Sequence, residues 1–147
     1  METLLDEIKR RVPPEVRATR DVHQVTALLN DGRTIVVERR IGEIALCDAL
    51  GGDRGTEVLD KLRALSAGTT GVPEAMARKL RYVVKWLDND ELDVGHRETR
   101  ASIDQLVPLV FTAAEAAAIK ALAERPAPVS EYDVRCACWS DDGEWLA

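Results

Sequence analysis

The sequence predicts a mainly α-helical fold, a compact bundle of seven or eight short helices with at most a minor β element at residues 34–38 and in a C-terminal turn. Hydrophobic residues make up 46% of the chain and aromatic residues only 4%. The core must therefore consist mainly of Leu, Val, Ile and Ala, and alanine and leucine favour helices. Apolar residues also recur at three- and four-residue steps, between frequent capping and breaking residues.

The N-terminal quarter of the chain predicts two helices. Thr3 is expected to cap the first helix, which must end at Pro13-Pro14 because the residue before a proline avoids the α region. A second helix is expected from about Thr19 to Leu29. The Asn-Asp-Gly sequence at 30–32 is a strong stop signal.

Residues 34–38 are the most strand-like stretch of the sequence. Three successive β-branched residues, Ile35, Val36 and Val37, favour an extended backbone. A single strand needs a partner, which leaves three alternatives. The stretch pairs with a C-terminal segment, pairs with another subunit, or forms an extended linker.

Two helices are expected between residues 41 and 68. The first covers 41–50 and ends at Gly51-Gly52, and the second is capped by Asp53 and stops at Gly68. The inward-facing residues of the first helix are expected to be Ile41, Ile44, Cys47 and Leu50. We expect a single domain over residues 1–147, with a soft division near 68–71.

The C-terminal half predicts four further helices. Residues 74–87 show the clearest helical periodicity, and 98–110 follow, with Pro108 near their end. Thr112-Ala-Ala-Glu115 is a capping box, so a helix should run from there to about Glu124. Ser130 can cap a final helix, and 139–145 should form a tight turn between two tryptophans.

Charge and hydropathy exclude several classes of protein. The net charge of −6 makes nucleic acid an unexpected main partner, because phosphate binding needs a surplus of Lys and Arg. No run of about 20 apolar residues could span a bilayer, and the first residues do not resemble a signal peptide. Three cysteines suit a reducing compartment. We therefore expect synthesis in a cytoplasm and no membrane contact.

No catalytic motif is apparent, and we do not expect an enzyme. The two histidines are His23, on a helix, and His96, in a loop. The alternative is a small hydrolase in which His96 acts with Asp93 or Glu98 as a general base. No cofactor or small-molecule substrate is expected.

The cysteines do not predict a metal site. Cys136 and Cys138 lie in a Cys-x-Cys pair, whereas structural zinc sites use wider spacings and a second pair. We expect these thiols, with Cys47, to act as small buried apolar side chains.

Two of the three tryptophans occur in the last nine residues, and tryptophan is enriched where proteins meet. One reading is a docking tail over 139–147; the alternative is that both rings fold back onto the domain. The candidate partner-binding residues are Ile35, Val36, Val37, Trp139, Trp145 and Leu146.

Four segments carry a resemblance to a known group of proteins: Val25-Thr-Ala-Leu-Leu-Asn30, the stretch from Trp86 to Gly95, residues 99–107, and residues 112–124. In this order they resemble small uncharacterised proteins encoded among the virion structural genes of tailed bacteriophages, over roughly residues 22–135. The resemblance implies a structural or adaptor component of the tail, neck or fibre region that binds other virion proteins or copies of itself. It also implies a location in the host cytoplasm and then the virion, and it assigns no site residues.

The alternative function is that of a small helical DNA-binding or regulatory protein. The expected helix, glycine turn and helix from Ile41 to Leu65 suit such a role. The nearby basic residues are Arg54, Lys61 and Arg63. Glu57 and Asp60 lie beside them, which weakens this alternative.

Overall fold

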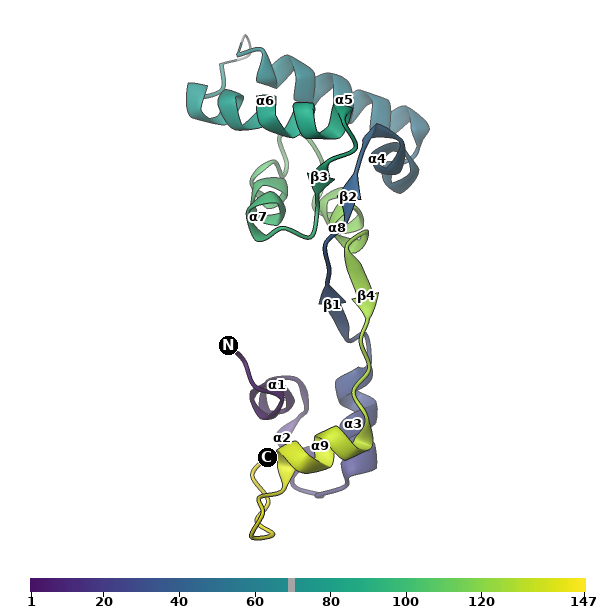
Figure 1. The fold of residues 1–147 in the computed structure, drawn as a ribbon, viewed down its shortest axis with the longest axis vertical. Helices are drawn as coiled ribbons and strands as arrows, with labels where there is room; N and C mark the ends of the chain where they lie inside the picture. The colour runs from purple at the N-terminus through teal and green to yellow at the C-terminus, as the bar shows by residue number, and fades with distance from the viewer. Residues whose placement is uncertain (69–70) are drawn as a thin grey trace. The chain divides into compact units, whose positions relative to one another are not determined.

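The structure is a computed structural model that describes residues 1–68 and 71–147. Within these residues the chain forms nine helices and four short strands, which confirms the prediction of a mainly helical fold (Figure 1). The chain divides into two units. Unit 1 comprises Met1–Ile35 with Pro126–Ala147, and unit 2 comprises Val36–Arg125. The soft division expected near 68–71 includes residues 69–70, which lie outside the described residues.

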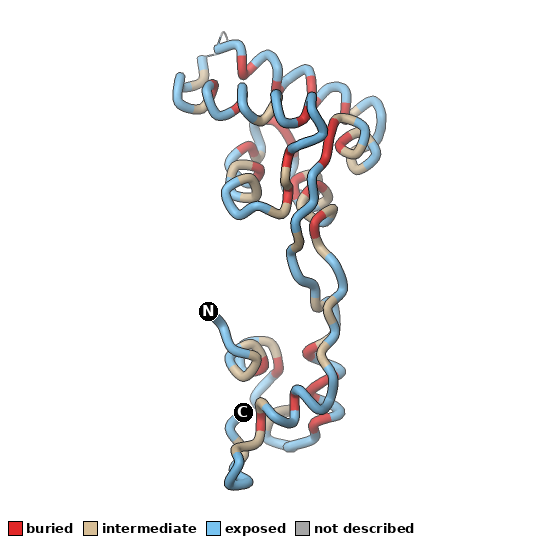
Figure 2. The backbone as a smooth tube through the Cα atoms, in the orientation of Figure 1, coloured by how far each residue is buried: buried red, intermediate tan, exposed pale blue. Residues whose placement is uncertain are grey.

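Unit 1 is built from both sides of the long intervening segment. Its helices are α1 (Leu4–Arg11), α2 (Pro14–Arg17), α3 (Val22–Asn30) and α9 (Glu131–Cys138). Helix α9 packs against both α1 and α3. The buried side chains of this unit are Ile8, Val12, Val22, Val25, Leu29, Val134 and Cys138 (Figure 2). Residues distant in sequence therefore share one apolar core.

Local capping chemistry explains where the helices of unit 1 begin. Thr3 and Asp6 form a capping box at the start of α1, as the sequence predicts for Thr3. Ser130 accepts a hydrogen bond from the backbone of Asp133 and begins α9, also as predicted. Asp21 caps α3, so this helix starts three residues later than expected.

The described residues of unit 2 form five helices and one strand pair. Its elements are β2 (Arg40–Ile41), α4 (Glu43–Leu50), α5 (Gly52–Ser66), α6 (Glu74–Asp88), β3 (Leu92–Asp93), α7 (Arg97–Gln105) and α8 (Ala113–Ala121). Helices α5 and α6 lie side by side, and α4 packs against α5 and α8 (Figure 1). Leu62, Leu80 and Phe111 are among the side chains of the core that these helices bury.

Strands are short in both sheets. Strand β1 (Thr34–Val36) pairs with β4 (Glu124–Pro126), so the partner of the predicted strand is a C-terminal segment, the first of the three alternatives. The strand itself is shorter than the expected 34–38. In unit 2, β2 and β3 are antiparallel, with Arg40 opposite Asp93. This pair brings the segment after α6 against the segment before α4.

Four sequence-based expectations about unit 2 are wrong. Ile41 was expected to lie in the first helix of this region, but it lies in strand β2, and α4 starts at Glu43. Ile44 was expected to face inward but is 79% exposed, because Leu46 is the buried residue of α4 and two residues correspond to about 200° of helix. Asp53 does not cap α5; the helix starts at Gly52 after Gly51, which has a φ of 91°. Helix α7 ends at Gln105, well before residue 110.

Within the described residues, no helix is both long enough and apolar enough to cross a membrane.

Candidate functional site

The predicted partner-binding residues in β1 are largely accessible. Ile35 and Val36 expose 47% and 49% of their surface, and Val37 is partly buried. The backbone N–H of Val37 donates to the carbonyl of Ala123 at 2.8 Å, which continues the pairing with the C-terminal strand. These side chains are thus accessible on a short strand that already has one backbone partner.

The C-terminal tryptophans contact each other. Trp139 and Trp145 form an isolated antiparallel bridge, and their ring centroids lie 5.0 Å apart in an edge-to-face arrangement. Both rings pack against the core of unit 1, the arrangement of the fold-back alternative, whereas Leu146 is 42% exposed. Docking of residues 139–147 onto a partner stays a prediction.

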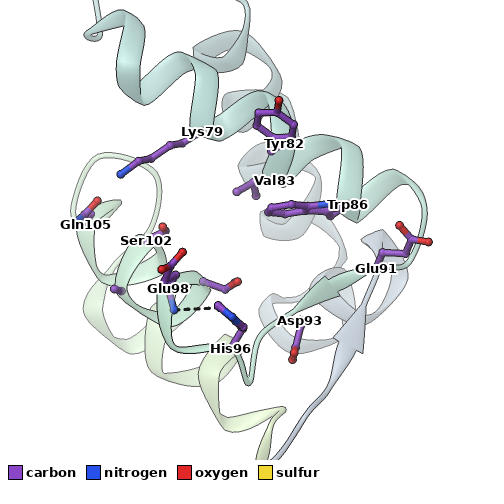
Figure 3. Close-up of a pocket in the computed structure, with 12 residues that line it drawn as sticks. Lys79, Tyr82, Val83, Trp86, Glu91, Asp93, His96, Glu98, Ser102 and Gln105 are labelled. Carbon is purple, nitrogen blue, oxygen red and sulfur yellow. Dashed lines mark hydrogen bonds between the residues drawn. The ribbon is translucent and has the colours of Figure 1, made fainter.

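Unit 2 has a surface groove between α6, β3 and α7. It is a groove of about 510 Å³, within the range of known ligand sites. Its lining residues are Lys79, Tyr82, Val83, Trp86, Glu91, Asp93, His96, Glu98, Thr99, Ala101, Ser102 and Gln105 (Figure 3). The sequence pattern did not predict this groove.

Helix α6 supplies an aromatic wall. Tyr82 and Trp86 lie one helical turn apart, with ring centroids separated by 5.9 Å, and they are 54% and 40% exposed. Leu80 and Leu87 are buried in the core on a different face of the same helix. One face of α6 therefore serves the core, and a neighbouring face presents large rings to the groove.

Helix α7 supplies a polar wall. His96 is its N-cap, and the imidazole Nδ1 accepts a hydrogen bond of 3.3 Å from the backbone N–H of Glu98. Glu98, Ser102 and Gln105 follow at helical spacing along the groove (Figure 3). Ile103 is buried, so this helix also divides its faces between core and groove.

Three carboxylates line the groove: Glu91 and Asp93 lie at its end near β3, and Glu98 lies on α7 beside Ser102 (Figure 3). Asp93 is held in place because its Oδ1 accepts from the backbone N–H groups of Arg39 at 3.0 Å and Gly95 at 2.9 Å. Glu91 and Glu98 take part in no ion pair among the described residues. The end of the groove that carries Glu91 and Asp93 is therefore acidic.

The structure describes one side-chain contact of each histidine. Within the described residues His96 hydrogen-bonds to backbone, not to the carboxylates of Asp93 or Glu98. His23 is exposed and pairs with Glu131 across α3 and α9, and the hydrogen bond followed by the charge of that carboxylate raises the pKa of the imidazole above 6.5. Its role is that of a surface ion pair.

Metal-ligating side chains are dispersed. In the described parts of the chain, no three His, Cys, Asp or Glu side chains are grouped to hold a metal ion. Cys138 is buried, and burial raises the pKa of its thiol. Cys136 is exposed, which corrects the expectation that both thiols of the Cys-x-Cys pair are buried. Residues two apart on a helix face different directions.

Two arginines of the predicted DNA-binding arrangement form ion pairs with carboxylates. Arg54 forms ion pairs with Glu57 and Glu115, and Arg63 does so with Glu43 and Asp88. Paired guanidinium groups have fewer donors to offer to phosphates. This geometry disfavours the DNA-binding alternative.

Comparison with known proteins returned no relative. No protein-family model matches the chain, and no significant match was found among curated proteins or solved structures.

Proposed function

We propose that this protein is a non-catalytic adaptor of a tailed-bacteriophage particle that acts by binding another polypeptide. The phage assignment rests on the sequence resemblance over roughly residues 22–135. The binding role rests on one structural observation, the groove between α6 and α7. Its exposed Tyr82 and Trp86 are side chains of the types enriched in the cores of protein interfaces.

The hydrogen bonds around the groove support binding over catalysis. Nδ1 of His96 accepts from the backbone at the start of α7, and Oδ1 of Asp93 accepts from two backbone N–H groups. These contacts fix the walls of the groove. A preformed groove reduces the conformational entropy that its own residues lose when a partner docks, and this favours recognition.

Particle composition tests the phage assignment. Phage particles are purified on a density gradient from induced cells that encode the chain and are analysed by quantitative mass spectrometry. We expect this protein at a constant molar ratio to the major capsid protein across the particle peak. Recovery only from the unassembled fraction would contradict a virion role.

A pair of variants tests the groove. Trp86→Ala removes the largest ring from the groove, and Tyr132→Ala removes another exposed aromatic ring, on α9, that does not line the groove. We expect Trp86→Ala to lower incorporation into particles by about tenfold or more, as for a typical interface hot spot, and Tyr132→Ala to leave it unchanged. Circular dichroism confirms that both variants fold. Equal incorporation would exclude the groove as the docking surface.

A further inference from the structure

We infer that the groove between α6 and α7 binds an arginine- or lysine-bearing segment of the partner polypeptide, with the cation beside the ring of Trp86 at the end of the groove that carries Glu91 and Asp93, and with Glu98 adding negative charge along the α7 wall. This inference rests on the proposed protein-binding function and specifies the chemistry of the partner.

The charges that line the groove favour a cationic occupant. Three carboxylates line it, whereas Lys79 is the single lysine or arginine among the described lining residues. Glu91 and Glu98 have no ion-pair partner within the described residues. An incoming guanidinium or ammonium would supply the missing charge.

The aromatic wall favours the same occupant. The faces of indole and phenol rings attract cations, and tryptophan does so most strongly. In Figure 3 Trp86 lies across the groove from His96, at the end that also carries Glu91 and Asp93. A cation over this ring would meet aromatic and carboxylate groups together. Neither feature alone would select a cation as strongly as the combination.

The length of the groove favours a polypeptide over a small amine. Lys79 and Trp86 are seven residues apart on α6, which corresponds to about 10 Å along the helix. Lys79 lies near Gln105 and Ser102, at the end of the groove away from Asp93 (Figure 3). An extended segment of about three residues spans this length. It could place its cation at the acidic end and offer carbonyl oxygens to Lys79.

A charge-neutral isostere of arginine gives the sharpest test. The probe is the capped peptide Ac-Gly-Ser-Arg-Leu-Ser-Gly-amide, compared with the same peptide carrying citrulline, which keeps the shape of arginine but has no charge. Binding to the full-length protein is followed by the indole N–H signals in ¹H–¹⁵N NMR spectra, with Trp86 assigned from Trp86→Phe. Trp139 and Trp145 serve as internal controls because they pack in unit 1.

We expect the arginine peptide to shift the Trp86 signal and to leave the Trp139 and Trp145 signals in place. The citrulline peptide should bind about tenfold more weakly. Glu91→Gln and Glu98→Gln should each weaken binding of the arginine peptide by about two- to fivefold. Asp60→Asn, an exposed change on α5 outside the groove, should have no effect.

The possible failures are distinguishable. Equal binding of both peptides at Trp86 would overturn the inference about charge and leave a protein-binding groove. Equally tight binding of N-acetylarginine amide would overturn the assignment of a polypeptide occupant. Absence of any shift at Trp86 would overturn the inference outright. The particle experiment uses neither peptide, and it therefore tests the virion role separately.

Discussion

At the residue scale, Glu115 combines two structural roles in one side chain. It accepts two hydrogen bonds from Arg54, at 2.7 Å to Oε2 and 3.0 Å to Oε1. It also accepts from the backbone N–H of Thr112 at 2.9 Å, which completes the capping box of α8. The same carboxylate therefore starts one helix and ties it to α5.

These contacts make a pH-dependent contribution to stability. The Arg54 hydrogen bonds, followed by the Thr112 N–H, lower the pKa of Glu115 from 4.5 to about 2. A carboxylate whose pKa is lowered by folding stabilises the native state above its unfolded pKa, and the effect is lost as the pH falls toward the folded pKa. The contribution should be complete above pH 4.5 and vanish toward pH 2.

Glu115→Gln tests this prediction, because glutamine can still complete the capping box but cannot form the ion pair. Urea denaturation should show a less stable variant at pH 7 and a difference from the unmodified protein that narrows below pH 4.5. Glu57→Gln is the matched control, since Glu57 meets the same arginine but is 69% exposed, and it should change stability much less. A difference that stays constant from pH 7 to pH 3 would contradict the assignment.

Single residues differ in how far the sequence predicts their roles. The caps at Thr3, Thr112 and Ser130 were predicted because N-cap bonds reach only two or three residues along the chain. The Arg54–Glu115 pair joins residues 61 apart, and no local pattern reports such a pair. Ile44 was misplaced because a short helix carries too few turns for its buried face to be recognised from periodicity.

At the element scale, the close approach of two segments shapes the acidic end of the groove. A Cβ atom on Gly95 would lie 1.9 Å from the carbonyl oxygen of Val37, which belongs to the backbone. A Cβ on Gly42 would lie 1.6 Å from Oδ1 of Asp90, which is the end of a side chain. A side chain can rotate away, whereas the backbone of the 37–39 segment is held by its hydrogen bonds.

Gly95→Ala should therefore lower the free energy of unfolding by about 1–3 kcal/mol, as an overpacked site does. It should also shift the Trp86 indole signal, because the turn after β3 carries Asp93 and His96 into the groove. Gly42→Ala, the matched control, should cost less and leave the Trp86 signal in place. Chemical denaturation and the NMR spectrum of the folded protein measure both effects. Equal losses for the two variants would show that the approach to Val37 is not the cause.

The sequence predicted most helices but neither the strand pairings nor the groove. Helix α6 carries a clear periodicity, and α8 and α9 carry side-chain N-caps, so the starts of these helices were predicted closely. Strand β4 contains Pro126 and spans three residues, too few to show alternation. The groove depends on how α6 and α7 pack, although the exposed rings of Tyr82 and Trp86, with Lys79 at helical spacing before them, were a signal.

At the scale of the whole molecule, two separate sets of buried side chains support the two units. Leu29 is fully buried among α1, α3 and α9, and Leu62 is 3% exposed within the core of unit 2. The buried residues of the first cluster all belong to unit 1, and those of the second all belong to unit 2. A cavity in one core should therefore weaken that unit first.

Leu29→Ala and Leu62→Ala form a matched pair, and each should cost about 2–5 kcal/mol in its own unit. Hydrogen exchange followed by mass spectrometry should show faster exchange in α1, α3 and α9 for Leu29→Ala. For Leu62→Ala the faster exchange should fall in α5 and α6. Uniform acceleration along the chain in both variants would indicate one cooperative unit instead.

The discontinuity of unit 1 bears on the order in which the nascent chain can fold. Asn30 and Val129, 99 residues apart, exchange two hydrogen bonds of 2.9 Å, and Val134 and Cys138 complete the core around Leu29. A ribosome that adds about 5–20 residues per second delivers α9 roughly 5–20 s after α3. The intervening unit is synthesised during that interval, and its last helix, α8, precedes α9 by only a few residues. The apolar faces of α1 and α3 meanwhile remain uncovered, which makes them the natural substrate for a chaperone.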